Sequence, residues 1–283
     1  MSDSMQKTET CVGSNMKTII VPVSGGKDSQ VVLSLALAAG HKPVCVHQNT
    51  GYDHPDTYRQ IEQMEQFYGV AIQHTTNRYG GMFGFLEHAQ YFPNSAARGC
   101  TQRLKQEPFA EWLDANGFNS GNAEIWFGMR SDESANREEK YGALSPDDLW
   151  TLGDIAAFYN DGKRKHLGQI PVRLPIVDWN TEKVFAYIIS EGAPLNPLYA
   201  RGHHRVGCYP CLLARKAEWQ AAARDETGAG HLRRMISLED EWTQNGNPRK
   251  FIKVHRVWDV RKFLSDAAAD LPEAAEECGY CSI

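Results

Sequence analysis

The chain has 283 residues, of which 42% are hydrophobic and 23% charged, and its formal net charge is -5 at pH 7. This length can bury a sizeable core, and we expect one large domain with a smaller C-terminal extension. No apolar run approaches the roughly 20 residues of a membrane-spanning helix, and the polar N-terminus lacks the apolar stretch of a secretory signal, so we expect a cytoplasmic protein. The negative charge argues against indiscriminate nucleic-acid binding, although a local basic patch could serve a specific polyanion.

The first half of the chain alternates short apolar runs with helical patterns. Strands are predicted at residues 17–23, 43–47, 70–74 and 124–128, and helices at 29–39, 55–69 and 108–116. Pro22 cannot donate a hydrogen bond to a neighbouring strand, so we place it at the end of the first strand. Strands alternating with helices predict an α/β fold with a doubly wound parallel sheet.

Beyond Tyr141 the pattern becomes mostly helical. We predict a helix near 147–159, a short strand at 172–176 and a helix at 181–190, with Asn180 as its N-cap and Gly192 as its stop. The predicted organisation is a disordered lead-in at 1–16, a main domain at 17–220, a helical extension at 221–265 and a mobile tail at 266–283 that carries a CxxC pair.

A phosphate-binding loop is predicted between the first strand and the first helix. Its residues are Ser24, Gly25, Gly26, Lys27, Asp28 and Ser29. Glycines let the backbone turn its N–H groups toward an anion, the helix N-terminus adds partial positive charge, and Lys27 supplies a full one. In a doubly wound sheet such a loop lies at the carboxyl ends of the strands, where ligands bind. The alternative interpretation is a tight glycine turn with exposed charges.

The string SGGKDS resembles the PP-loop of the adenine-nucleotide alpha-hydrolase superfamily, whose members bind ATP or a related nucleotide and act at its alpha-phosphate. Three further stretches resemble the phosphoadenylyl sulfate (PAPS) reductase branch of that superfamily. They are HQNTGYDHPDTY, GMRSDESANR, and LPIVDWNTEKVFAYI followed by NPLYARGHHRVGCYPC. The resemblance spans about residues 17–219 and implies the superfamily's fold. It also implies further nucleotide-binding residues, namely Asn49 (in a position where the branch can have aspartate), Gly128, Arg130 and Arg137.

The intact loop favours cleavage of ATP. Reductases that act on PAPS usually carry a degraded loop, because their substrate offers no pyrophosphate to hold, whereas the ATP pyrophosphatases of the superfamily keep the loop intact. The resemblance therefore implies catalytic roles for Lys27 and Asp28. The loop would grip the beta and gamma phosphates while the alpha-phosphate is attacked and an adenylate forms, usually with Mg²⁺.

The tail favours a different activity. Reductases of this branch end in ECGxH, whose cysteine attacks the sulfur of the sulfonucleotide and is later resolved by thioredoxin. The stretch Glu277-Cys278-Gly279-Tyr280-Cys281 matches the first three letters and has cysteine in place of histidine. A thiolate at Cys278 could be the catalytic nucleophile or accept sulfur, and Cys281 could resolve it as a disulfide. The alternative is two incidental thiols.

Seven cysteines in a cytosolic protein raise the question of metal binding, because that compartment keeps thiols reduced. Cys208 and Cys211 form a CxxC pair, which we place at the start of a helix. Iron–sulfur members of the branch hold a [4Fe-4S] cluster with a mid-chain cysteine pair and a later CxxC. The resemblance therefore implies Cys100, Cys208 and Cys211 as ligands, with Cys278 or Cys281 as the fourth, or an open iron. Zinc, or no metal, is the alternative.

Three hypotheses for function follow. The first is an ATP-dependent enzyme that adenylates an acceptor and delivers sulfur to it. Its implied partners are an adenine nucleotide, a sulfur donor such as a cysteine desulfurase, and an acceptor that could be DNA, RNA or a small molecule. The second is a thiol-dependent reductase of PAPS or adenylyl sulfate with a thioredoxin-like reductant. The third is a nucleotide-binding partner subunit whose own catalysis is weak or absent.

Overall fold

The computed structural model describes residues 17–94, 97–247 and 260–269. Within these residues one sheet has the strand order β3-β2-β1-β4-β6-β5. The strands are β1 (Thr18–Pro22), β2 (Val44–Gln48), β3 (Ile72–Thr75), β4 (Ala123–Trp126), β5 (Leu149–Thr151) and β6 (Pro171–Arg173). All neighbouring pairs are parallel except β5 and β6. The predicted doubly wound α/β fold is confirmed, and Pro22 ends β1 as expected.

Both faces of the sheet are covered because successive strand residues point to opposite sides. On one face, Ile19, Val21 and Cys45 pack against the helices α1 (Lys27–Ala38), α2 (Pro55–Tyr68) and α8 (Thr181–Ser190). On the other face, Ile20 and Val46 pack against α5 (Glu107–Ala115). Buried parallel strands with helices on both faces place the ends of the strands, and not the faces, in reach of a ligand.

The predicted helix ends follow from local chemistry. Pro55 opens α2, whose preceding His54 side chain accepts a hydrogen bond from the Asp56 amide, and Gly69 ends the helix in the left-handed conformation. The Asn180 side chain caps α8 by accepting from the Lys183 amide. These boundaries were predicted because capping residues act within a few positions of the helix they begin or end.

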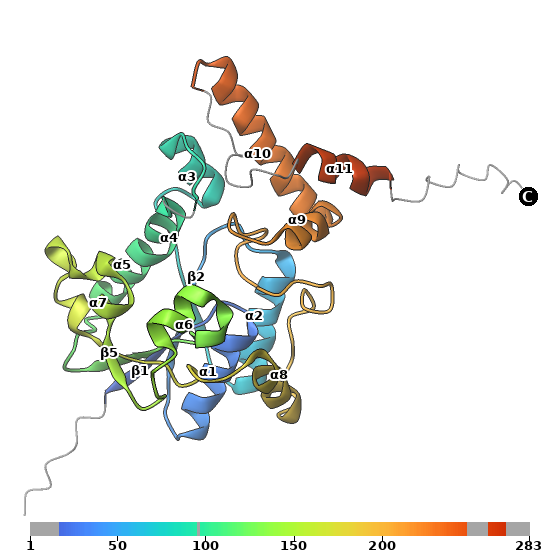
Figure 1. Cartoon of the computed structure of the whole chain (residues 1–283). Coiled ribbons are helices and arrows are strands. Elements are labelled where there is room, and N and C mark those ends of the chain that lie inside the picture. Colours follow the sequence, from blue (N-terminus) through green and yellow to red (C-terminus); the bar gives the residue numbers. More distant parts are fainter. Residues whose placement is uncertain (1–16, 95–96, 248–259, 270–283) are drawn as a thin grey trace, which may run out of the picture.

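A second group of helices lies beyond one end of the sheet (Figure 1). It contains α3 (Met82–Ala89), α9 (Lys216–Ala223), α10 (Glu226–Gln244) and α11 (Val260–Ala269), which share a separate apolar core. Leu86 of α3, Trp219 of α9 and Trp242 of α10 are buried in it. The division of the chain into domains stays a prediction, and the boundary proposed at residue 220 falls inside α9. No helix among the described residues is long and apolar enough to cross a bilayer.

The helix predicted near 147–159 is wrong. Residues Leu149–Thr151 form β5, in which Trp150 pairs with Val172 of β6, and only the short α7 (Leu152–Ile155) follows. Thr151 and Asp154 form a capping box that starts α7, so the residues before Thr151 stay extended. The predicted strand at 172–176 is shorter and earlier, at Pro171–Arg173. Among the helical segments without a prediction are α3, α6 (Ala135–Tyr141), and α4 (Gly99–Thr101) with the π-helical turn Gln102–Gln106 that follows it.

Candidate functional site

The predicted phosphate loop joins β1 to α1 at the carboxyl end of the sheet. Gly25 has a φ of +69°, and a Cβ there would lie 2.8 Å from the Thr57 side chain of α2. A Cβ on Gly26 would lie 3.2 Å from the Tyr199 hydroxyl. The first glycine is therefore needed for its backbone conformation and for close contact with α2, and the second for the approach of Tyr199.

The N-terminus of α1 is only partly capped. The Lys27 amide donates to the Tyr199 hydroxyl at 2.9 Å, whereas the Asp28 and Ser29 amides find no acceptor among the described residues. The Ser29 hydroxyl instead faces back into the loop, where it accepts from the Ser24 amide at 3.1 Å and donates to the Gly26 carbonyl at 3.0 Å. Open amides at the N-terminus of a helix make a site for an anion.

Asp28 links two cations beside this helix terminus. Its carboxylate accepts from the Lys27 ammonium at 2.8 Å and from Arg130 Nε at 2.7 Å. The Lys27 side chain is 6% exposed and that of Arg130 is 2% exposed. The shared Asp28 carboxylate is the main reason why both cations can be buried.

Arg130 lies where the sequence places it, after β4, but its donors are occupied. Besides Asp28 and Asp132, its guanidinium donates to the Trp179 carbonyl at 3.0 Å and to the Thr181 hydroxyl at 3.1 Å. It thereby ties α1 to the start of α8. As the residues lie here, Arg130 holds Asp28 and offers little to a substrate.

The other predicted nucleotide-binding residues surround the loop. A Cβ on Gly128 would lie 2.7 Å from the Asp28 carbonyl carbon, so the end of β4 touches the start of α1. Asn49 shapes the turn after β2, since its side-chain oxygen accepts from the Gly51 amide at 2.8 Å and from the Tyr58 hydroxyl at 2.9 Å. These roles shape the site, and binding by either residue stays a prediction.

Arg137 brings positive charge to the same side of the loop. Burial lowers the pKa of its guanidinium, Arg205 and Arg98 lower it further, and Tyr141 and Asp28 oppose the shift. Arg98 and Arg205 are exposed and pair with no carboxylate among the described residues. Arg137 itself pairs with Glu133, so Arg98 and Arg205 are the cations on this side of the loop that suit a site for an anion.

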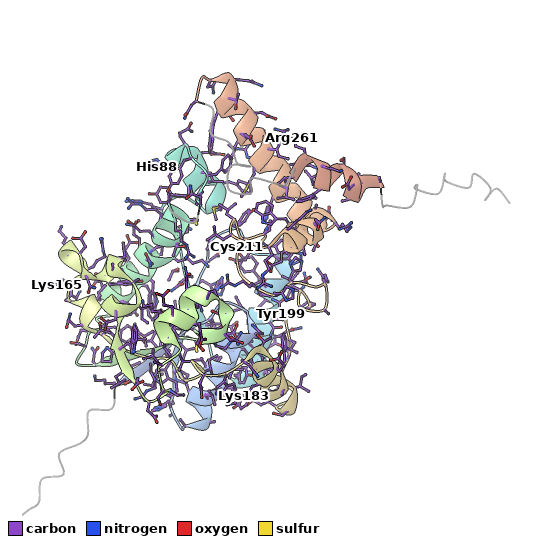
Figure 2. The ribbon with its side chains drawn as sticks, viewed as in Figure 1. His88, Lys165, Lys183, Tyr199, Cys211 and Arg261 are labelled. Carbon is purple, nitrogen blue, oxygen red and sulfur yellow. The ribbon has the colours of Figure 1, made fainter. Side chains whose placement is uncertain are left out.

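The cysteines named by the sequence analysis come together at the neighbouring strand end. Cys208 forms an antiparallel bridge with Asp53, and its sulfur lies 3.6 Å from the Thr50 hydroxyl. Burial raises the pKa of the Cys208 thiol to about 12, against the influence of Lys105, while Cys211 adds to the increase. Burial and Cys211 also raise the pKa of Cys100. Figure 2 labels Cys211 between the sheet and the C-terminal helices.

The expectation that the CxxC pair begins a helix is wrong. Cys208 to Cys211 form a turn, and α9 starts only at Lys216. The bridge to Asp53 holds Cys208 in an extended conformation, and the Tyr209 amide donates to the Tyr52 carbonyl, so this segment follows the neighbouring loop.

Lys105 is a residue of this site that the sequence analysis missed. It lies on the π-helical turn after Cys100, and part of its surface is exposed while its ammonium group is surrounded by protein. Cys208 raises the pKa of this ammonium most strongly, against burial, and Asp53, Cys211 and Cys100 add to the effect. No local signal in the sequence marks Lys105, because its strongest electrostatic neighbour, Cys208, is brought to it by the fold.

The three cysteines have the donor chemistry of a zinc or iron–sulfur site. However, no group of three or more His, Cys, Asp or Glu side chains in the described part of the chain is arranged to hold a metal ion. In their described positions the three thiols do not fit an iron–sulfur cluster, because the Lys105 ammonium lies close to all of them. Cys278 and Cys281 lie outside the described residues. The iron–sulfur expectation stays a prediction.

Comparison with known proteins settles the family. The model of the phosphoadenosine phosphosulfate reductase domain matches residues 18–214. The chain belongs to this family. The resemblance noted in the sequence is thereby confirmed.

Among named relatives, the adenosine 5'-phosphosulfate reductase of Deinococcus radiodurans is 24% identical over 212 residues, which cover 75% of this chain and 73% of that protein. Sulfate adenylyltransferase subunit 2 of Agrobacterium fabrum is 30% identical over 184 residues, covering 62% and 55%. An uncharacterised protein of Methanocaldococcus jannaschii is 28% identical over 212 residues, and the chain covers only 39% of its length. A solved PAPS reductase from Candida auris aligns with a TM-score of 0.49 at 17% identity, over 69% of this chain and 83% of that one.

These findings place the chain in a family of nucleotide-binding enzymes of sulfur metabolism. The expectation of an enzyme is confirmed as membership in this enzyme family. The named relatives differ in their reactions, since one group is named for reducing a sulfonucleotide and the other for adenylyl transfer to sulfate.

Proposed function

We propose that the protein is an ATP pyrophosphatase of this family that adenylates an acceptor and then delivers sulfur to it. The observation that carries the proposal is the linked group of Lys27, Asp28 and Arg130 beside the open N-terminus of α1. A substrate without a pyrophosphate would leave these charges without an evident use.

The two cations around Asp28 have different roles in this proposal. Arg130 is also fixed by the Trp179 carbonyl and the Thr181 hydroxyl, whereas the Lys27 ammonium donates to Asp28. When magnesium-bound ATP arrives, Lys27 can leave Asp28 for the phosphates while Arg130 still neutralises that carboxylate. The exchange avoids leaving a buried charge unpaired, which would cost several kcal/mol.

The phosphates would lie across the N-terminus of α1. The Asp28 and Ser29 amides donate to the beta and gamma phosphates together with Lys27, and Arg137 faces the same region with Arg205. An acceptor oxygen attacks the alpha-phosphorus, the bond to the bridging oxygen breaks, and pyrophosphate leaves. Charge moves onto the leaving pyrophosphate, where the amides and Lys27 stabilise it.

The thiol region would serve the later sulfur step. Cys208 contacts Thr50 and Asp53 after β2, and Cys100 and Cys211 lie near it, at the same edge of the sheet as the loop. Because burial raises the pKa of Cys208 to about 12, this thiol is protonated at neutral pH and must lose its proton before it can accept or donate sulfur. The nucleotide chemistry needs no thiol, so the two steps are separable.

A second candidate is a thiol-dependent reductase of PAPS or adenylyl sulfate. Lys105 is the observation that favours it, because a cation that faces three thiols could hold the sulfonate of a sulfonucleotide while a cysteine attacks the sulfur. The named relatives include such reductases. The relatives named subunit 2 of sulfate adenylyltransferase also support the alternative of a chain that works with a partner subunit.

Pyrophosphate release tests the proposal directly. The purified protein is incubated without oxygen and with a dithiol reductant in the presence of ATP, PAPS or adenylyl sulfate, and pyrophosphate and sulfite are measured for each. Pyrophosphate from ATP that is lost in Lys27→Ala and kept in Lys163→Ala, an exposed lysine away from the loop, supports adenylation. Sulfite from a sulfonucleotide without pyrophosphate from ATP supports the reductase instead.

A further inference from the structure

Tyr199 lies in the segment that follows α8 and crosses the phosphate loop. The segment is fixed there by Asn196, which is buried and whose amide nitrogen donates to the Gly25 carbonyl at 3.2 Å. Tyr199 itself is labelled in Figure 2, and its hydroxyl accepts from the Lys27 amide at 2.9 Å. A residue 172 positions away in the sequence thus caps the helix that the loop begins.

The ring of Tyr199 has a defined position. The Phe185 ring contacts its edge with centroids 5.3 Å apart, and the Lys27 ammonium lies 5.7 Å from its centroid. Burial raises the pKa of the Tyr199 hydroxyl above its ordinary value, so the group stays neutral and keeps its proton. A neutral phenol can donate one hydrogen bond while it accepts another.

The Tyr199 hydroxyl accepts a hydrogen bond but makes no donation to any described residue. Tyr199 is half-buried, and a hydroxyl held at the loop with its hydrogen unused by the described residues can donate to an acceptor that enters the site. The neighbouring groups are donors as well, namely the open amides of Asp28 and Ser29 and the Lys27 ammonium. The Asp28 carboxylate, an acceptor in the first turn of α1, is already held by Lys27 and Arg130. Donors that gather in this way complement an anion with several oxygens.

We propose that Tyr199 binds the nucleotide, donating its hydroxyl hydrogen to a non-bridging oxygen of the phosphate group at the N-terminus of α1 while it still accepts from the Lys27 amide. The proposal rests on the proposed use of the loop as the nucleotide site. The proposal also specifies which nucleotides Tyr199 favours. Tyr199 contributes to the affinity for compounds that carry a pyrophosphate group beyond the alpha-phosphate, such as ATP and inorganic pyrophosphate, and contributes little for AMP.

Tyr199→Phe tests this role, because it removes one oxygen and keeps the ring. Calorimetry with ATP, inorganic pyrophosphate and AMP should show affinity for the first two reduced by on the order of tenfold, as expected when a hydrogen bond to a charged group is lost. AMP binding should change by less than about twofold. Tyr187→Phe is the matched control. Its hydroxyl also contacts α1, 3.2 Å from the Ser34 hydroxyl, but this contact is about two helical turns from the loop, so its loss should leave the loop undisturbed.

A donor in place of the hydroxyl separates binding from helix capping. The amino group of 4-aminophenylalanine at position 199 can donate to phosphate, so this variant should recover most of the pyrophosphate affinity that Tyr199→Phe loses. Thermal unfolding of each variant without ligand reports the contribution of the cap on its own.

The outcomes are distinct. Unchanged pyrophosphate affinity in Tyr199→Phe, with binding lost in Lys27→Ala, would overturn the role of Tyr199 and leave the proposed function standing. Tighter binding in Tyr199→Phe would show that the hydroxyl competes with phosphate for the Lys27 amide, which also overturns it. Binding that is equal in wild type and Lys27→Ala would reject the loop as the nucleotide site.

Discussion

The phosphate loop and the thiol region lie at the same edge of the sheet but balance their charges differently. At the loop, Asp28 offsets the two buried cations Lys27 and Arg130. At the thiols, the Lys105 ammonium makes no hydrogen bond or ion pair with any described residue, and burial keeps Cys208 protonated at neutral pH. The loop is therefore prepared for a polyanion, whereas the thiol region needs a change of protonation or a bound anion before it can act.

The largest expected effect is the loss of pyrophosphate release when the phosphate loop, and not the thiol region, is changed. Lys27→Ala should reduce pyrophosphate release from ATP by about a hundredfold, because it removes the positive charge that stabilises the leaving pyrophosphate. Its stability should fall by less than about 1 kcal/mol, since Asp28 keeps Arg130 as a partner. Pyrophosphate assays and denaturant titrations measure the two quantities. Full activity in this variant would remove the loop from the chemistry.

Removing the carboxylate should instead affect stability. Asp28→Ala leaves Lys27 and Arg130, both nearly inaccessible to solvent, without their shared anion, and Arg130 retains only the half-exposed Asp132 among carboxylates. We expect the free energy of unfolding to fall by about 2 kcal/mol. Urea titration compares this variant with Lys27→Ala. If the two variants are equally stable, Asp28 does not hold the two cations together.

Replacing the thiol-region cation should have the opposite effect on stability. Lys105→Met removes an ammonium that has no hydrogen-bonded partner among the described residues and keeps a similar apolar volume. Cys208, which raises the pKa of Lys105 most, is protonated at neutral pH and then attracts the ammonium little, so the cost of burial remains. The protein should therefore be as stable as wild type or more stable by about 1 kcal/mol, and pyrophosphate release should persist. Denaturant titration and the pyrophosphate assay check both statements. A loss of stability greater than about 1 kcal/mol would mean that Lys105 has a structural role.

The smallest expected effect is an absence of pH dependence. An ordinary tyrosine begins to lose its proton, and with it a hydrogen-bond donor, as the pH approaches 10.0, but burial raises the pKa of Tyr199 above that value. The ratio of ATP affinities between wild type and Tyr199→Phe should therefore stay constant from neutral pH up to 10.0. Calorimetry at several pH values measures it. A ratio that falls toward one over this range would show that Tyr199 ionises at its ordinary pKa.

The sequence predicted the features that depend on neighbouring residues. The loop, the start of α2 at Pro55 and the Asn180 cap each arise from a few consecutive positions, so a single sequence contains the signal. β5 was missed because its extended conformation depends on pairing with β6, which is a tertiary contact.

The site was predicted less completely for the same reason. Tyr199 reaches the loop from a segment far along the chain, and Lys105 faces Cys208 across the fold. Arg130 was placed correctly, but its four hydrogen-bonded partners come from α1, the loop after β4 and the start of α8, so sequence alone could not show that its donors are occupied.

One measurement tests most directly whether the nucleotide chemistry is independent of the thiols. Cys278→Ser is assayed for pyrophosphate release from ATP, and the wild-type tail peptide is analysed by mass spectrometry after incubation with ATP or with PAPS. We predict that Cys278→Ser releases pyrophosphate at nearly the wild-type rate, because the phosphate chemistry needs no thiol. A sulfonate adduct on the tail from PAPS, together with no cleavage of ATP by the wild-type protein, would contradict this account and identify a reductase.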